Sequence, residues 1–195
     1  NYASSGSLAK QIDQGAPADV YVSANPKWMQ FLAEKNIIDD THHRIFVYNE
    51  LVFIGAQKTP VFSMEDIVSL ERVAIGSPGS VPAGHYAMQA MEAAGIYADM
   101  ADSNKLVMAK DVRQALLYAD RGEVAGAFVY KTDAMIARSA VTLFTVPRDL
   151  YDRVAYPIGL TTAGLRKNGA QKLYDFIQSA EAIEILSNYG FEPAD

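Results

Sequence analysis

Three short stretches of the sequence place serine, glycine or a capping residue directly before a segment with helical periodicity. They are residues 3–7 (ASSGS), 77–84 (SPGSVPAG) and 110–114 (KDVRQ). The first turn of a helix leaves backbone N–H groups without intrahelical partners, and the helix dipole adds partial positive charge there. Such a helix start suits an anion. Taken singly, each stretch is better explained by a loop and an N-cap, with Asp111 the expected cap of the third.

The elements that would position these stretches alternate between strands and helices. Runs rich in β-branched residues predict strands, and segments with apolar residues at i, i+3 and i+4 lie between them. The predicted strands cover residues 19–23, 45–56, 72–76, 105–108, 124–130, 141–146 and 154–160. This alternation favours an α/β fold with a mainly parallel sheet, in which ligands bind at strand carboxyl ends and helix N-termini. Three such helix starts in one chain are therefore more informative than one.

Composition and motifs argue against several classes of function. The chain of 195 residues has a formal net charge of −6 and no Lys/Arg cluster, so nucleic-acid binding is not expected. It has no cysteine, which excludes disulfides and thiol chemistry, and no apolar run long enough to cross a bilayer. No nucleophile elbow or Ser/His/Asp arrangement predicts an enzyme. His42 and His43 have no accompanying ligand cluster, so no metal site is predicted.

Several longer stretches combine with ASSGS into a more specific pattern. They are residues 15–29 (GAPADVYVSANPKWM), 73–84 (VAIGSPGSVPAG), 109–134 (AKDVRQALLYADRGEVAGAFVYKTDA), 154–160 (VAYPIGL) and 183–193 (IEILSNYGFEP). Together they resemble the periplasmic molybdate-binding proteins, the substrate-binding components of molybdate ABC transporters, nearly from end to end. The resemblance implies a periplasmic-binding-protein-like (type II) α/β fold with two lobes, each a mainly parallel sheet flanked by helices. Lobe I would comprise residues 1–48 and 154–195, and lobe II residues 49–153.

The resemblance also implies which residues bind the ligand. In the family, neutral groups hold the oxyanion: serine hydroxyls, backbone amides and a tyrosine hydroxyl. Carried over to the matching positions, these are the hydroxyl of Ser5, with Ser4 adjacent, the amides of Ala83 and Val112, and the hydroxyl of Tyr130. No catalytic residue is implied, and molybdenum would be bound only as molybdate by these same groups.

The two lobes would each contribute to the site. Ser5 would belong to lobe I, and the other ligands to lobe II, so an oxyanion in the cleft would draw the lobes together. The expected hinges are residues 48–50 and 155–157. Arg113 follows a proposed ligand amide, and its expected role is a salt bridge with Asp111 or an exposed position.

The implied function is that of a non-enzymatic carrier with no cofactor. It would bind molybdate or tungstate in the periplasm and deliver it to the permease of an ABC importer, touching the membrane only through that permease. The full-length form would be a monomer that does not bind nucleic acid. Two alternatives remain open: a receptor for another tetrahedral oxyanion such as sulfate or phosphate, and the effector-binding domain of a transcription regulator. An enzyme on the same scaffold is a third, with no base or metal set to support it.

The sequence departs from the family at its beginning. The family has a strand, a serine-containing loop and a helix before the ASS motif, and these are absent from this sequence, as is a signal peptide. We therefore expect this chain to lack a strand of lobe I and one wall of the pocket. We also expect weakened ligand binding and an exposed sheet edge, which favours dimerisation.

Overall fold

The computed structural model describes residues 1–194, which form two compact units. Unit 1 contains Asn1–Asn49 and the chain from Val154 onward, and unit 2 contains Glu50–Arg153. The sequence analysis predicts the boundaries between the two lobes at 48/49 and 153/154. No helix within residues 1–194 is both long and apolar enough to span a membrane.

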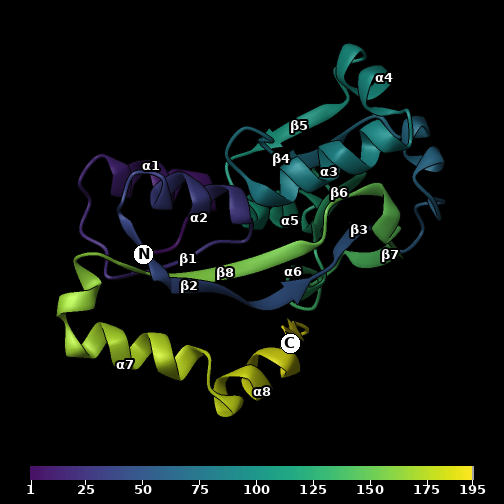
Figure 1. The fold of residues 1–195 in the computed structure, drawn as a ribbon. Coiled ribbons are helices and arrows are strands. Elements are labelled where there is room, and N and C mark those ends of the chain that lie inside the picture. The colour runs from purple at the N-terminus through teal and green to yellow at the C-terminus, as the bar shows by residue number, and fades with distance from the viewer. Residues whose placement is uncertain (195) are drawn as a thin grey trace. The chain divides into compact units, whose positions relative to one another are not determined.

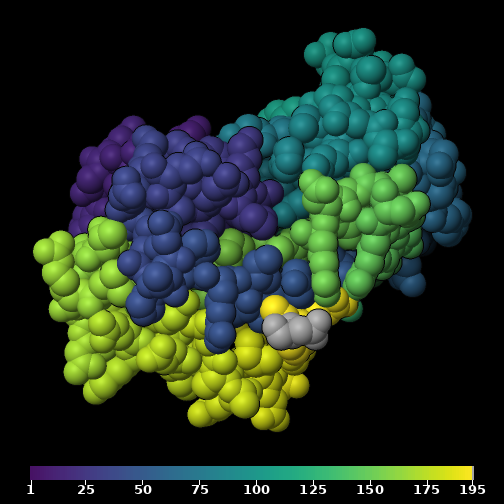
Figure 2. Space-filling model, viewed as in Figure 1, coloured from purple at the N-terminus to yellow at the C-terminus, as the bar shows by residue number. Residues whose placement is uncertain are grey.

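Unit 1 is built from both ends of the chain. Its elements are α1 (Ser5–Asp13), β1 (Val20–Val22), α2 (Pro26–Ala33), β2 (Ile38–Asn49), β8 (Val154–Thr161), η3 (Gly164–Arg166), α7 (Asn168–Ile177), α8 (Ala180–Asn188) and β9 (Glu192–Pro193). The sheet has the strand order β1-β8-β2-β9. Helices α1 and α2 lie on one face of the sheet and α7 and α8 on the other (Figure 1). The N-terminal and C-terminal segments of this unit pack into one body (Figure 2).

The sheet of unit 1 is antiparallel in every described pair, so the expectation of a mainly parallel sheet in each lobe is wrong here. The cause is β8, the strand that returns from unit 2. It inserts between β1 and β2 and runs opposite to both, with Val20 opposite Leu160 and Asn49 opposite Val154. Strands β1 and β2 are therefore parallel to each other but are not hydrogen-bonded neighbours.

Unit 2 has a five-stranded mixed sheet. Its elements are β3 (Leu51–Gly55), η1 (Glu65–Ser69), β4 (Val73–Gly76), α3 (Pro82–Ala93), α4 (Tyr97–Asp102), β5 (Leu106–Ala109), α5 (Val112–Asp120), β6 (Gly126–Tyr130), α6 (Lys131–Ala134), β7 (Val141–Thr145) and η2 (Arg148–Leu150). The strand order is β5-β4-β6-β3-β7. Strand β4 pairs in parallel with β5 and β6, whereas β3 is antiparallel to β6 and β7.

Both faces of the unit 2 sheet are covered. Val52, Ile54 and Val129 pack in one cluster with the buried face of α5. Side chains alternate along a strand, so Phe53 and Phe128 point to the opposite face. Their rings pack edge to face there, with 5.0 Å between the ring centroids. Strands β3, β4 and β6 are buried throughout. These strands therefore form a rigid support for the segments that follow them.

The predicted strand over residues 45–56 is two strands: β2 ends at Asn49 and β3 begins at Leu51, with Glu50 between them. Strand β2 belongs to unit 1 and β3 to unit 2. The Glu50 carboxylate accepts hydrogen bonds from Lys131 Nζ at 2.9 Å and Arg148 Nη2 at 2.6 Å. These hydrogen bonds hold the pKa of Glu50 below its usual value. Glu50 is the first residue of unit 2, and its ion pairs attach the start of this unit to Lys131 and Arg148.

Candidate functional site

The three parallel strands of unit 2 end at the same edge of its sheet. Strands β4, β5 and β6 end at Gly76, Ala109 and Tyr130, and each is followed by a helix that begins at that edge. Ser77 joins two of the strand ends, because its backbone N–H and its hydroxyl both donate to the carbonyl of Ala109, at 2.9 and 3.2 Å. The edge therefore gathers the starts of α3, α5 and α6.

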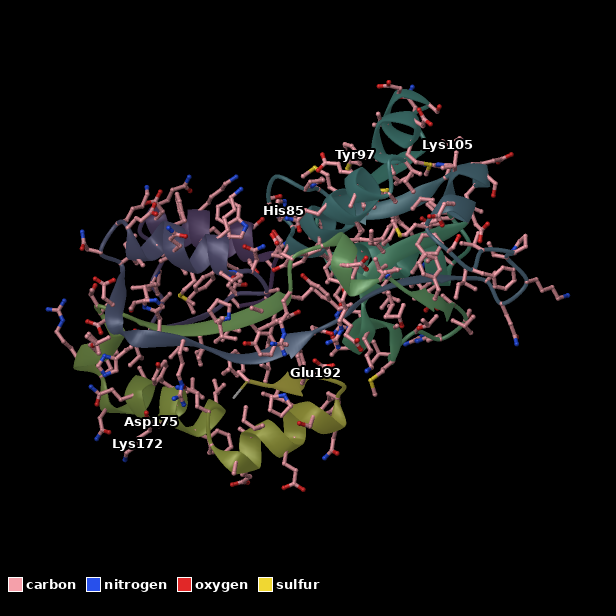
Figure 3. The ribbon with its side chains drawn as sticks, turned by 45° about the vertical axis from the view of Figure 1, so that its right-hand side comes forward. His85, Tyr97, Lys105, Lys172, Asp175 and Glu192 are labelled. Atoms are coloured by element: carbon pink, nitrogen blue, oxygen red, sulfur yellow. The ribbon has the colours of Figure 1, made fainter. Side chains whose placement is uncertain are left out.

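Helix α3 begins unusually close to the end of β4. A Cβ atom on Gly84 would lie 1.7 Å from the Gly76 carbonyl oxygen, so only glycine allows this packing. Ala83 is the second residue of the helix and is buried. The residue before the helix, Val81, makes no side-chain capping hydrogen bond. His85 lies in this first turn, whereas Tyr97 and Lys105 lie beyond the other end of α3 (Figure 3).

Helix α5 begins with a capping arrangement that confirms the prediction for Asp111. The Asp111 carboxylate accepts from the backbone N–H of Gln114 at 2.8 Å, and the Gln114 side-chain oxygen accepts from the backbone N–H of Lys110 at 2.8 Å. Val112 is the first helical residue. Its amide is one of those that an α-helix does not use internally.

Tyr130 occupies the turn from β6 into α6. It is 3% exposed and stands at the N-cap position of α6. Asp133, three residues later, accepts a hydrogen bond from the backbone N–H of Tyr130. Arg113 of α5 lies with its Nε 3.0 Å from Asp133 Oδ1. Of the two expectations for Arg113, the exposed position is confirmed, because its side chain is 63% exposed, and its carboxylate partner is Asp133 rather than Asp111.

The carboxyl group of Asp133 is the most perturbed acid of this edge. Only 7% of its side chain is exposed, and this burial raises its pKa to about 6. Arg113 and the amide of Tyr130 act in the opposite direction, while the neighbouring Asp111 raises the pKa further. Asp133 lies three residues after the N-cap Tyr130, as the acid of a capping box does, but a tyrosine does not match the Ser or Thr of that motif, so the local signal is weak. The ion pair with Arg113, twenty residues away, has no local signal.

Ser4 and Ser5 begin α1 in unit 1, and both are buried. Ser4 is the N-cap and accepts from the backbone N–H of Ser7 at 3.3 Å. Ser5 Oγ accepts from the backbone N–H of Ala24 at 3.0 Å. A hydroxyl that accepts in this way keeps its own hydrogen for donation, which is the polarity an anion requires.

Tyr21 of β1 forms a hydrogen bond with the start of α1. Its hydroxyl donates to the carbonyl of Ser5 at 2.8 Å. Burial raises the pKa of Tyr21 to about 12, so the phenol stays protonated and keeps donating at neutral pH. Ser5 is thus held on both sides: Tyr21 fixes its carbonyl and Ala24 fixes its hydroxyl oxygen.

An apolar cavity of about 900 Å³ opens beside α1 and β1 in unit 1. Ser5 and Tyr21 lie at its wall. Most of the other lining residues are apolar, among them Leu8, Ile12, Leu173, Phe176, Ile177 and Leu186. The sequence patterns did not indicate this cavity.

The predicted site residues fall into two groups, one in each unit. Ala83, Val112 and Tyr130 share the strand-end edge of unit 2, and Ser4 and Ser5 share the start of α1 in unit 1. Within residues 1–194, no group of three or more His, Asp or Glu side chains is arranged to hold a metal ion.

Comparison with known proteins identifies the family to which this chain belongs. A family model described as bacterial extracellular solute-binding protein matches residues 1–192. The chain belongs to this family, whose members bind a solute and are components of transport rather than enzymes.

Individual relatives of the chain include proteins named for molybdate binding and for ABC transport. The molybdate-binding protein ModA of Haemophilus influenzae is 35% identical over 98% of this chain and 77% of its own length. YvgL of Bacillus subtilis, provisionally named an ABC transporter substrate-binding lipoprotein, is 34% identical over 98% of this chain and 74% of its own length. The periplasmic molybdate-binding protein of Azotobacter vinelandii, 20% identical, superposes with a TM-score of 0.87, covering 100% of this chain and 87% of that one. The last likeness confirms the expected periplasmic-binding-protein fold.

Proposed function

We propose that this chain binds molybdate or tungstate and is the substrate-binding component of an ABC importer. The observation that carries the proposal is the donor character of the starts of α1, α3 and α5. Ser5 keeps a hydroxyl hydrogen for donation, and the strand-end edge of unit 2 presents the first-turn amides of α3 and α5 beside Tyr130. The name of the 35% identical ModA supports molybdate as the ligand, and the name of the 34% identical YvgL supports the role in an ABC transporter.

The proposed ligand groups are neutral hydrogen-bond donors. A buried dianion without a cation is stable only when it is densely hydrogen-bonded, and bonds from neutral donors to charged oxygens are roughly twice as strong as neutral ones. Donors alone also discriminate by protonation, because an oxyanion that carries a proton requires an acceptor. Fully ionised molybdate and tungstate meet that requirement, and hydrogen phosphate does not. Sulfate would have to be distinguished by its smaller size.

The remaining parts of the proposal follow from this role. The protein would act in the periplasm as a monomer and transfer its ligand to a membrane permease. The proposed hinges are Asn49–Glu50 and Arg153–Val154, where the chain passes between the units. The second differs from the expected hinge at residues 155–157, because those residues lie within β8. Binding of one oxyanion by groups of both units would favour a closed state that the permease recognises.

Calorimetric titration with molybdate, tungstate, sulfate and phosphate tests the proposal. We expect binding of molybdate and tungstate, and much weaker or no binding of sulfate and phosphate. Preference for sulfate would overturn the ligand assignment and leave a receptor for another oxyanion. No heat with any of the four would overturn the proposed oxyanion function of this chain.

A tyrosine variant tests the site within the same titration. Tyr130→Phe removes one hydroxyl donor, and we expect roughly 10- to 100-fold weaker molybdate binding, because a hydrogen bond to a charged group contributes about 1.5–3 kcal/mol. Tyr189→Phe is the matched control, since Tyr189 is 62% exposed at the end of α8. Equal affinities for the two variants would remove Tyr130 from the site.

A further inference from the structure

The buried carboxylate of Asp133 connects two of the segments that carry proposed ligand groups. It accepts from the backbone N–H of Tyr130 and forms an ion pair with Arg113, the residue after Val112. One side chain thus spans the end of β6 and the start of α5. Helix α5 contacts β6 and α6 directly, so the carboxylate lies where these elements meet.

The energetic cost of this carboxylate argues for a role beyond structure. Its side chain is 7% exposed, whereas its partner Arg113 is 63% exposed, so the cation gives only partial compensation. A second carboxylate, Asp111, lies near enough to repel it. A neutral side chain of the same shape would be accommodated at lower cost. Ionised groups kept under such conditions concentrate at functional sites.

We propose that Asp133 is a positioning residue for the oxyanion site, holding the Tyr130 turn and the first turn of α5 in one fixed relation. The inference rests on the proposed function, because it assumes that Tyr130 and the Val112 amide bind the ligand. Asp133 itself is an acceptor and would not touch the anion. Its effect is exerted through the backbone of Tyr130 and through Arg113.

Charge and geometry predict opposite results when Asp133 is replaced by asparagine. The change removes a negative charge near the anion, so a purely electrostatic role predicts tighter molybdate binding. It also removes the ion pair with Arg113 and weakens the bond from the Tyr130 amide, so a positioning role predicts weaker binding. We expect about tenfold weaker binding, by analogy with the loss seen when the hydrogen-bond partner of a metal-binding residue is removed.

The pH dependence of molybdate affinity gives a second test of the positioning role. Burial raises the pKa of Asp133 to about 6, so we expect molybdate affinity to fall as pH drops through that value. The charged groups that face the carboxyl group come from α5, namely Arg113 and Asp111. Strand β3 contributes no ionisable side chain, β6 contributes only Tyr130, and Lys131 of α6 is engaged with Glu50.

The experiment measures molybdate affinity by calorimetry on both sides of pH 6 for four proteins: the unchanged chain, Asp133→Asn, Asp120→Asn and Arg113→Gln. Asp120 is the matched control, because it lies at the opposite end of α5. Its carboxylate accepts hydrogen bonds from the backbone N–H groups of residues 138–140. Asp133→Asn should bind more weakly and lose the fall near pH 6, whereas Asp120→Asn should keep both the affinity and the profile.

Arg113→Gln keeps the inference falsifiable if Asp133→Asn does not fold, since an exposed guanidinium is easily replaced. Without the cation the pKa of Asp133 rises, so the affinity should fall at a higher pH than in the unchanged chain. Tighter or unchanged binding by Asp133→Asn, or an unshifted profile for Arg113→Gln, overturns the positioning role alone. Failure of the unchanged chain to bind molybdate overturns the proposed function, and the inference with it.

Discussion

The two units support their helix starts in different ways. In unit 2, α3 lies against the end of β4 through backbone contact between Gly84 and Gly76, on a sheet whose central strands are fully buried. In unit 1, the start of α1 is held by hydrogen bonds from Tyr21 and Ala24 to Ser5, beside an apolar cavity of about 900 Å³. One helix start depends on shape, and the other depends on polar bonds.

The difference teaches which changes each half tolerates. Close backbone packing has no freedom to relax, so an added methyl group in unit 2 disturbs the fold itself. A hydrogen-bonded serine beside a cavity can be truncated with little strain, so a change in unit 1 should affect ligand binding more than folding. Substitutions in the two units can therefore separate stability from affinity.

The largest expected effect is that of Gly84→Ala. Its Cβ would lie 1.7 Å from the Gly76 carbonyl oxygen, so α3 must move away from β4. We expect unit 2 to lose about 3 kcal/mol of unfolding free energy. Urea titration followed by circular dichroism measures the loss. Fluorescence of Trp28, the single tryptophan and a residue of unit 1, should respond much less.

Gly79→Ala is the control for this prediction. Gly79 lies in the same loop, and no atom lies within 4 Å of the position its Cβ would occupy. Its variant should unfold at the same urea concentration as the unchanged chain. Equal midpoints for the two variants would show that the packing of α3 on β4 is not what stabilises unit 2.

Much of this architecture could be predicted from local patterns. The alternation of strands and helices and the Asp111 cap are local properties, because periodicity and capping act within a few residues. The helix of residues 82–93 also follows from its apolar spacing, although it begins at Pro82, within the stretch of residues 77–84 that the sequence analysis places before the helix. Proline is well suited to a first helical position, and the glycine-rich loop obscured that signal.

Long-range pairing could not be predicted in the same way. The antiparallel sheet of unit 1 arises because β8 returns between β1 and β2, and nothing in the β8 sequence records its neighbours. Residues 45–56 divide at Glu50, whose ion-pair partners Lys131 and Arg148 are distant in sequence. The same holds for Arg113 and Asp133. The oxyanion ligands and the hinges stay predictions, since they depend on a ligand and on how the two units move.

A smaller effect on stability but a clear effect on affinity is expected for Ser5→Ala. The change leaves the Ala24 amide without its acceptor, which costs about 1 kcal/mol of unfolding free energy. It also removes a proposed donor to the anion, so molybdate binding should weaken roughly 10- to 100-fold. Calorimetry and urea titration measure the two quantities separately. Ser187→Ala, on the exposed face of α8, should change neither by a comparable amount.

The smallest expected effect is a dependence of unit 2 stability on pH. Burial raises the pKa of Asp133 to about 6 in the folded chain, above its ordinary value of 3.8. The protonated form is therefore favoured by folding, and the stability it contributes is fully present below the ordinary value and is lost as pH rises through 6. Between pH 7 and 5 the unfolding free energy should increase by about 1 kcal/mol from this group alone. Glu50 acts with the opposite sign, because its pKa is lowered, and its contribution is lost only at more acidic pH.

Comparison with Asp133→Asn isolates this contribution. The asparagine cannot titrate, so the difference in unfolding free energy between the two proteins cancels the groups that they share. That difference should change by about 1 kcal/mol between pH 7 and 5 when unfolding is followed by circular dichroism. The Trp28 signal of unit 1 should show no such change. A constant difference would mean that the carboxylate of Asp133 is well solvated in solution and that unit 2 has no buried charge beside the start of α5.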